Sequence, residues 1–167
     1  MAKVLLINPS YSPSYGGTRV KVVNPIYPTL GLATIAATAL QGKHKVEILD
    51  FSWRPYDFEP IRKRILQTKP DIVGITATTP LMNQLRDISV LVKDISKNIL
   101  VIGGGPHPSA LPEETLQETM LDAVLIGEAD YSFRNICDGY PLSGILGISY
   151  RDDDQIFSTK QRPLITN

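Results

Sequence analysis

Three consecutive glycines, Gly103, Gly104 and Gly105, followed by Pro106 and His107, form the most suggestive pattern in this 167-residue sequence. A tight turn with a positive φ angle needs only one glycine, so a purely structural role leaves the other two unexplained. Three glycines in a row also let a ligand lie against the backbone and hydrogen-bond to its amides. We therefore expect this turn to be the centre of a ligand-binding site, with no catalytic residue in it.

The remaining candidate site residues also follow apolar runs. They are Asn8, Pro9, Ser10, Thr76, Thr78, Thr79, Gly127 and Glu128. The three threonines suit the end of a strand on their own account, because β-branched side chains favour extended backbone, but beside the glycines they would form a polar, uncharged lining. Glu128 suits the start of a helix as well as it suits a hydrogen bond to a ligand.

Continuous apolar runs, typical of strands covered on both faces, alternate with segments of helical periodicity. The expected strands are 4–7, 45–49, 71–75, 99–102 and 123–126, and the expected helices are 30–40, 57–67, 81–97, one beginning at 112, and 131–137. This alternation predicts an α/β fold of the flavodoxin-like or Rossmann-like type, with a doubly wound, five-stranded parallel sheet and helices on both faces. Ligands bind such sheets beyond the carboxyl ends of the strands, where all the candidate residues lie.

The C-terminal part has a different pattern. Residues 145–151 and 155–158, joined through three aspartates, predict a β-hairpin at the edge of the sheet. We expect one domain over 1–140, a hairpin extension of that domain over 141–159, and the start of a linker to a missing C-terminal domain over 160–167. The abrupt end at Asn167 is typical of a domain excised from a longer enzyme.

Composition excludes several classes of protein. Lysine plus arginine and aspartate plus glutamate both number 17, so the chain lacks the basic excess of a nucleic-acid-binding protein. The apolar stretches are too short for a signal peptide or a membrane span. Cys137 is the only cysteine, which excludes an internal disulfide, favours the reducing cytoplasm and cannot by itself hold an iron–sulfur cluster.

Familiar catalytic and phosphate-binding motifs are missing from the strand ends. A dinucleotide site needs G-x-G-x-x-G after the first apolar run, where this chain has Asn8-Pro9-Ser10-Tyr11, and no G-x-x-x-x-G-K-[ST] loop occurs. No Ser–His–acid arrangement or metal-ligating set is visible, since His44 is predicted to lie at the surface at the opposite end of the strands. The site therefore suits a large ligand that carries its own chemistry.

Seven short motifs occur in a specific order: V-L-L-I-N-P at 4–9, P-T-L-G-L at 28–32, V-E-I-L-D at 46–50, K-P-D-I-V-G-I-T at 69–76, G-G-G-P-H-P at 103–108, L-P-E-E at 111–114 and G-E-A-D at 127–130, with Phe133 after the last. In this order they resemble the N-terminal cobalamin-binding domains of radical S-adenosylmethionine enzymes. The resemblance implies cobalamin as ligand, with its nucleotide tail flanked by Gly103, Gly104 and Gly105. It places residues 76–79 and 127–128 beside the tail.

Two features of proteins related to this family are missing from the sequence. Residues 8–29 contain no histidine, so the D-x-H-x-x-G cobalt ligand of the mutase branch is missing, and we expect base-off cobalamin without a histidine ligand from the first loop. His107 is the remaining candidate, although a turn residue bonded to backbone or ligand is the stronger expectation. The cysteine triplet of the radical half is missing too, so an iron–sulfur cluster and S-adenosylmethionine would belong to a C-terminal domain toward which residues 162–165 lead.

The leading hypothesis is thus the cobalamin-binding module of a radical S-adenosylmethionine methyltransferase or cyclase, non-catalytic in isolation. The first alternative is a stand-alone nucleotide-binding transferase that uses the same strand-end cleft. The second is a regulatory module of the same fold that binds a protein partner. The expected partners are cobalamin and the C-terminal domain of the same polypeptide, with no nucleic acid and no membrane.

Overall fold

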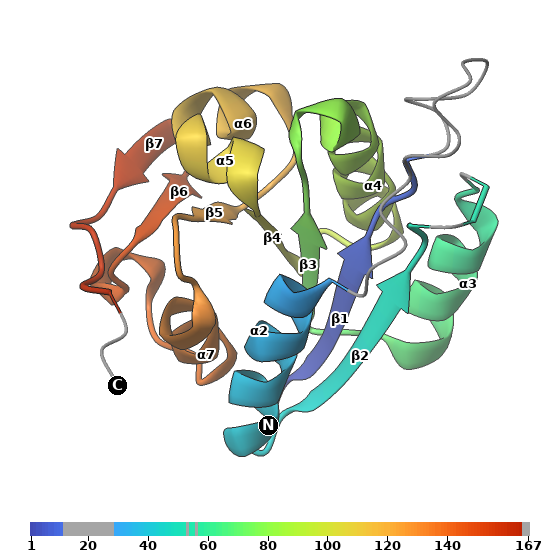
Figure 1. The fold of residues 1–167 in the computed structure, drawn as a ribbon, viewed down its shortest axis with the longest axis horizontal. Coiled ribbons are helices and arrows are strands. Elements are labelled where there is room, and N and C mark those ends of the chain that lie inside the picture. The colour runs from blue at the N-terminus through green and yellow to red at the C-terminus, as the bar shows by residue number, and fades with distance from the viewer. Residues whose placement is uncertain (12–28, 53, 56, 165–167) are drawn as a thin grey trace.

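A single seven-stranded sheet forms the centre of the molecule in the computed structural model, which describes residues 1–11, 29–52, 54–55 and 57–164 (Figure 1). Its strands are β1 (Lys3–Asn8), β2 (Lys45–Asp50), β3 (Ile72–Thr76), β4 (Leu100–Gly104), β5 (Ala123–Leu125), β6 (Ile148–Asp152) and β7 (Gln155–Ser158). The spatial order is β2-β1-β3-β4-β5-β6-β7. Neighbouring strands from β2 to β5 pair parallel, whereas β5–β6 and β6–β7 pair antiparallel.

Helices cover both faces of the sheet, so the predicted α/β class is confirmed (Figure 1). They are α2 (Leu30–Gln41), α3 (Glu59–Thr68), α4 (Met82–Ile95), α5 (Pro106–Ala110), α6 (Pro112–Glu118) and α7 (Asp130–Cys137), with 3-10 turns η2 (Thr79–Leu81) and η3 (Leu142–Gly144). Buried side chains of α3, α4 and α6 pack on one face, and those of α2 and α7 pack on the other. None of the helices in the described ranges is both long enough and apolar enough to span a bilayer.

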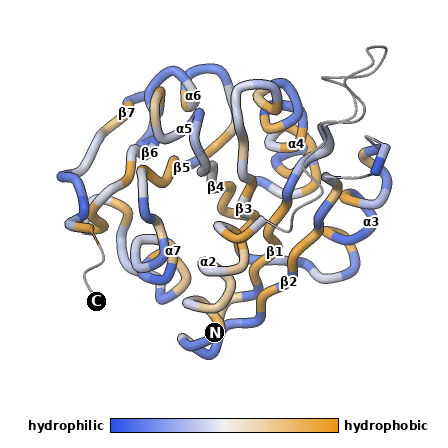
Figure 2. Tube along the Cα trace, viewed as in Figure 1, coloured by the Kyte–Doolittle hydropathy of each residue, from blue (hydrophilic) through white to orange (hydrophobic). Residues whose placement is uncertain are grey.

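Successive side chains of each strand point to opposite faces of the sheet, so the sheet has one hydrophobic core on each face. In β1, Leu5 and Ile7 face the α3–α4 side, whereas Val4 and Leu6 face the α2–α7 side. All four side chains are buried, which explains why β1 appears in the sequence as a continuous apolar run. Figure 2 shows the apolar strands at the centre, with hydrophilic residues along parts of α3, α4 and α7, whereas α2 is mostly apolar.

The strand order reverses at β1, because β2 lies on one side of it and β3 on the other. In doubly wound sheets, ligands bind beyond the carboxyl ends of the strands at such a point. The register places Ile75 opposite Gly103 and Thr76 opposite Gly104, so the ends of β3 and β4 are level with each other. The fold therefore brings the threonine and glycine motifs side by side.

The predicted glycine turn is in part a strand. β4 continues through Gly103 and Gly104, and only Gly105, with a φ of 99°, turns the chain. Pro106 then begins α5, whose five residues are too few to show helical periodicity in the sequence. His107, expected as a turn residue bonded to backbone or ligand, lies in the first turn of α5, and its amide donates to the carbonyl of Ala77.

The prediction of a surface position for His44 was wrong, since the residue is 6% exposed. The amide of Ala2 donates to Nδ1 at 3.1 Å, so Nε2 carries the hydrogen and donates to Asp138 Oδ1 at 2.9 Å. These partners are 42 and 94 residues away in the chain, and no local pattern could reveal them. His44 ties the start of β1 to the end of α7.

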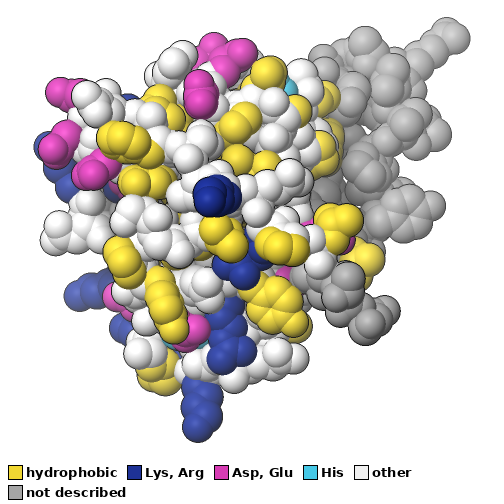
Figure 3. All heavy atoms as spheres, turned by 90° about the vertical axis from the view of Figure 1, so that its left-hand side faces the viewer, with side chains coloured by type: hydrophobic (Ala, Val, Ile, Leu, Met, Phe, Trp, Pro, Cys, Tyr) yellow, Lys and Arg dark blue, Asp and Glu magenta, His cyan; other side chains and the backbone are white. Residues whose placement is uncertain are grey.

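The face formed around β6 and β7 is chemically mixed. Acidic, basic and apolar side chains lie interspersed on it (Figure 3). Tyr150 of β6 stacks on Phe157 of β7 with ring centroids 5.7 Å apart. No single sign of charge dominates this face.

Candidate functional site

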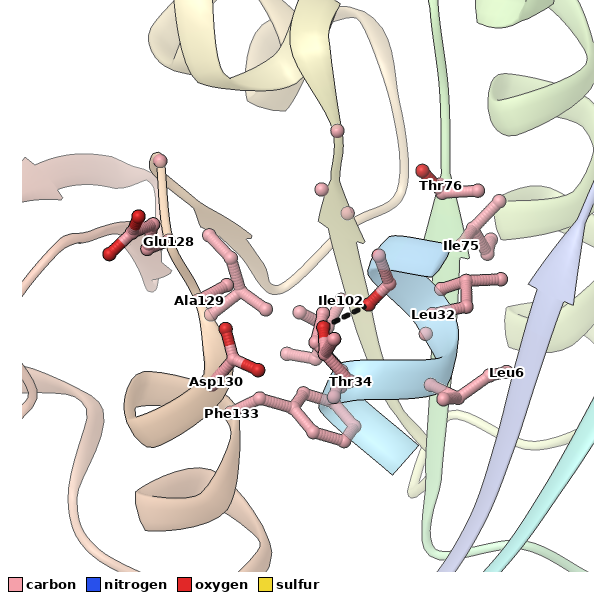
Figure 4. A pocket seen from close by; sticks show the side chains of 18 residues that line it. Leu6, Leu32, Thr34, Ile75, Thr76, Ile102, Glu128, Ala129, Asp130 and Phe133 are labelled. Carbon is pink, nitrogen blue, oxygen red and sulfur yellow. Dashed lines mark hydrogen bonds between the residues drawn. The ribbon is translucent and has the colours of Figure 1, made fainter. Parts of the chain in front are cut away.

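A groove of about 280 Å³ lies between α2 and α7, above β3, β4 and β5 (Figure 4). Its floor contains Leu6, Gly74, Ile75, Ile102 and Leu125, its walls contain Leu32, Ile35, Ala129 and Phe133, and its polar residues are Thr34, Thr76, Glu128 and Asp130. We call this cavity the α2–α7 groove. Small-molecule sites usually start near 300 Å³, so the groove would hold only part of a large ligand.

Six of the predicted site residues line the α2–α7 groove: Thr76, Gly103, Gly104, Gly105, Gly127 and Glu128. Seven others do not line it: Asn8, Pro9, Ser10, Thr78, Thr79, Pro106 and His107. The two groups lie at the same edge of the sheet, but only residues of the first contribute backbone or side-chain atoms to the cavity between the helices. The structure therefore divides the predicted site into a groove and a rim.

Each of the three glycines has a different role. A Cβ at Gly103 would lie 2.5 Å from Leu121 Cδ1, on the face away from the groove, so Gly103 makes room for the core. A Cβ at Gly104 would meet only Leu125 Cβ, at 3.8 Å, and would project to the groove side, as Ile102 does two residues earlier. Gly105 needs its positive φ, and a Cβ there would lie 2.7 Å from Thr76 Oγ1. Of the three, Gly104 is the one whose missing side chain leaves the groove open.

Part of the rim connects the loops that follow β3 and β4. Thr79 Oγ1 lies 3.1 Å from His107 Nδ1, and the His107 amide donates to the carbonyl of Ala77 at 3.3 Å. The Ala77 amide donates to Gly104 at 2.9 Å, and Thr78 Oγ1 lies 3.1 Å from the Tyr11 hydroxyl. These bonds hold the edge of the groove in place.

Asn8 and Ser10 are both buried at the β1–β2 side. Asn8 Nδ2 donates to Asp50 Oδ1 at 2.8 Å, and the Ser10 hydroxyl donates to the carbonyl of Arg54. Pro9, between them, is buried as well. Their polar groups thus join the ends of β1 and β2, and the rest of the loop, residues 12–28, lies outside the described residues.

Sequence reasoning missed the helix residues of the groove. Leu32, Ile35 and Phe133 have the spacing of ordinary core residues, so their pattern could not distinguish a groove wall from a packed interior. Asp130 begins α7, where an acidic residue suits the helix N-terminus, and it accepts from Thr38 Oγ1 at 3.5 Å. Gly74 looked like part of an apolar strand, yet a Cβ there would lie 2.7 Å from Leu6 Cδ2 and 3.7 Å from Phe133.

Within the described ranges, no group of three histidine, cysteine or acidic side chains could hold a metal ion. Among the residues that the structure describes, which leave out 12–28, the lining has hydroxyl, carboxylate and backbone groups but no lysine, arginine or histidine. Its inner part is apolar, and the missing Cβ of Gly104 leaves room beside the backbone. These features fit a bulky ligand with an uncharged, ring-like portion and do not fit a polyphosphate.

Cys137, at the end of α7, is unsuited to nucleophilic chemistry. Burial, with a smaller contribution from the charge of Asp138, raises the pKa of this thiol to about 12. We expect a thiol reagent at pH 8 to label the native protein far more slowly than the urea-unfolded protein, because the thiolate is the reactive form. Between about pH 9 and 12 the unfolded thiol ionises first, so this group should lower stability as the pH rises. Equal labelling rates in the two states would contradict the burial of Cys137.

Comparison with known proteins gives concordant results. The pattern of the B12 binding domain family matches residues 17–137. An uncharacterized methyltransferase of Pyrococcus horikoshii is 38% identical over 99% of this chain and 36% of its own length. The anaerobic magnesium-protoporphyrin IX monomethyl ester cyclase of Synechocystis sp. is 24% identical over 98% of this chain and 33% of its length. This chain thus spans about a third of the length of these relatives.

The structural comparison agrees on the fold. The radical S-adenosylmethionine methyltransferase TsrM from Kitasatospora setae, solved with cobalamin and a 4Fe-4S cluster bound, matches 100% of this chain and 30% of its own, with a TM-score of 0.75 and 20% identity. The sheet and the α2–α7 groove therefore define a Rossmann-like ligand-binding domain. The chain belongs to the B12 binding domain family, which confirms both the resemblance found in the sequence and the prediction of cobalamin as cofactor.

Proposed function

We propose that this chain is the cobalamin-binding module of a longer radical S-adenosylmethionine enzyme of the methyltransferase or cyclase type. The observation that carries the proposal is the open space at Gly104, where the missing Cβ leaves the α2–α7 groove accessible next to the strand backbone. Family membership identifies the ligand class, and the methyltransferase and cyclase relatives indicate the type of parent enzyme. The chain itself would bind and orient the cofactor.

The residues of the groove divide by chemistry in a way that suits the nucleotide tail. Leu6, Ile102 and Phe133 would surround its apolar base. Moving an aromatic ring from water into such an apolar lining is favourable. Thr34 and Asp130 would accept or donate hydrogen bonds at the sugar. The Gly104–Gly105 backbone and Thr76 lie at the strand end, where the corrin side of the cofactor would emerge. Bound cobalamin would supply the cobalt chemistry, and the protein would supply its position.

We further propose that cobalamin binds base-off and without a histidine ligand from this chain. His107 lies outside the described lining of the groove, and its Nδ1 contacts Thr79 Oγ1, which leaves only Nε2 that could approach a metal. We expect His107→Ala to leave the stoichiometry unchanged and to lower affinity less than fivefold, the scale of one lost neutral hydrogen bond. Electron paramagnetic resonance of the reduced, cob(II)alamin-loaded protein should show no axial-nitrogen splitting in either form. A splitting that His107→Ala removes would identify His107 as a cobalt ligand.

The iron–sulfur cluster and S-adenosylmethionine would bind outside these 167 residues. A 4Fe-4S cluster needs several thiolates, and this chain has only the buried Cys137. The radical domain of the same polypeptide would therefore be the main protein partner of this module. A single buried thiol also suits the reducing cytoplasm, where we place the parent enzyme.

Titration of the purified protein with hydroxocobalamin, followed by absorbance, tests the proposal. We expect saturable binding of one cobalamin per chain, with the spectrum changing toward the base-off form. ATP, which the nucleotide-transferase alternative requires, should neither bind nor compete. A folded protein that binds ATP but not cobalamin would replace this proposal with the alternative.

A further inference from the structure

The segment after β7 is bound to the domain along the outer side of α7. The amide of Thr159 donates to the carbonyl of Ile148 at 2.9 Å, and the amide of Gly147 donates to that of Lys160 at 2.8 Å. Arg162 then reaches α7 itself. The chain therefore leaves the last strand in a fixed course across the back of this helix.

Arg162 makes the contact with α7 through its guanidinium group. Its Nε donates to Ser132 Oγ at 2.8 Å, and Ser132 Oγ in turn donates to the carbonyl of Leu146 at 2.7 Å. A second guanidinium nitrogen lies 3.0 Å from the side chain of Asn135, whose amide oxygen accepts when it faces Arg162. Ser132 is 1% exposed, whereas Asn135 and Arg162 are partly exposed, so Arg162 reaches from the surface to a buried hydroxyl of α7. A planar fork of donors suits two acceptors on one helix turn.

The opposite side of the same helix turn forms a wall of the α2–α7 groove. Ala129, Asp130 and Phe133 line the groove, while Ser132 and Asn135 face the departing chain. Because α7 has only eight residues, groups bound on one side fix the position of the other. A small displacement of this helix would change the width of the groove directly.

We propose that Arg162 is a positioning residue that couples the chain leaving the domain to cofactor binding in the groove. The inference rests on the proposed function and adds a regulatory link to it. Arg162 holds α7 at the distance from α2 that the cofactor needs, and the bound cofactor in turn holds α7 where Arg162 can bind it. Such coupling is reciprocal by thermodynamic necessity.

The first test compares two arginines of similar geometry. Arg86 donates from Nε to the carbonyl of Glu118 at 3.0 Å and from a second nitrogen to the Glu118 carboxylate at 2.9 Å, and it lies on the α4–α6 side, away from the groove. We expect Arg162→Ala to weaken hydroxocobalamin binding about tenfold, within the usual range of coupling between sites. Arg86→Ala should change it less than twofold. Arg162→Lys, which keeps one donor toward Ser132, should restore part of the affinity.

Hydrogen exchange provides a readout that a merely structural role would not move. In the wild type, cobalamin should slow exchange of the Gly147 and Thr159 amides, because the hydrogen bonds of these amides join the departing segment to Gly147 and Ile148. In Arg162→Ala at saturating cobalamin, this slowing should disappear while amides of β3 and β4 remain protected. Equal affinity and equal slowing in both proteins would overturn the coupling and leave the proposed function intact. A wild type that binds no cobalamin would instead overturn the proposed function and this inference with it.

Discussion

Gly104→Val will abolish cobalamin binding while the protein remains folded. The Cβ of the new residue would meet only Leu125 Cβ at an ordinary 3.8 Å, and Gly104 has no positive φ that forbids a side chain. Two further methyl groups would then occupy the space beside the β4 backbone in the α2–α7 groove. A closely packed protein region cannot accommodate an extra methylene group without a cost in free energy. A ligand that needs the space filled by these methyl groups should therefore be excluded.

A graded series makes the Gly104 prediction sharper. Gly104→Ala should weaken hydroxocobalamin binding by about ten- to a hundredfold, as expected for an overpacking cost of 1–3 kcal/mol. Gly144 provides the matched control, since a Cβ there also has its nearest neighbour at 3.8 Å, in Pro141, but lies in η3 outside the groove lining. Gly144→Val should bind as the wild type does. If Gly104→Val binds normally, the cofactor does not occupy the groove beside β4.

The glycine motif shows how far sequence reasoning could go. Three glycines after an apolar run predicted a close approach to the backbone, and all three contribute to the lining of the groove. The sequence could not show that the Cβ direction of Gly103 points to the opposite face, because that assignment requires knowing that β4 continues to Gly104. Only the alternation of the observed strand distinguishes a glycine that admits Leu121 from one that opens the groove.

The helix walls were beyond prediction for a different physical reason. A groove between two helices depends on the distance between them, and Leu32 and Phe133 are 101 positions apart in a chain whose local pattern describes only their own helices. His44 presents the same difficulty, since its partners Ala2 and Asp138 come from distant segments. The periodicity of the sequence identified the individual helices and strands. The shape of the site depends instead on how pairs of these elements pack against each other.

Phe133→Ala should cause the largest loss of stability among the substitutions considered. The side chain is 1% exposed and packs in the core shared by α7, α2 and the sheet, so its removal would leave a cavity. Comparable truncations of buried aromatic residues cost about 3–5 kcal/mol, against a total stability of about 5–15 kcal/mol for a domain. Urea unfolding followed by circular dichroism would measure the difference as a lower midpoint at an unchanged slope.

Phe157→Ala makes the same chemical change at an exposed position and serves as the control. Phe157 on β7 is 41% exposed and stacks on Tyr150, so its truncation should cost only about 0.5–1.5 kcal/mol. The two variants should also differ in binding, because Phe133 forms a wall of the α2–α7 groove and Phe157 does not line it. Saturating cobalamin should therefore raise the unfolding midpoint of Phe157→Ala as much as that of the wild type, and that of Phe133→Ala by less. Equal shifts would show that the cofactor does not rest against α7.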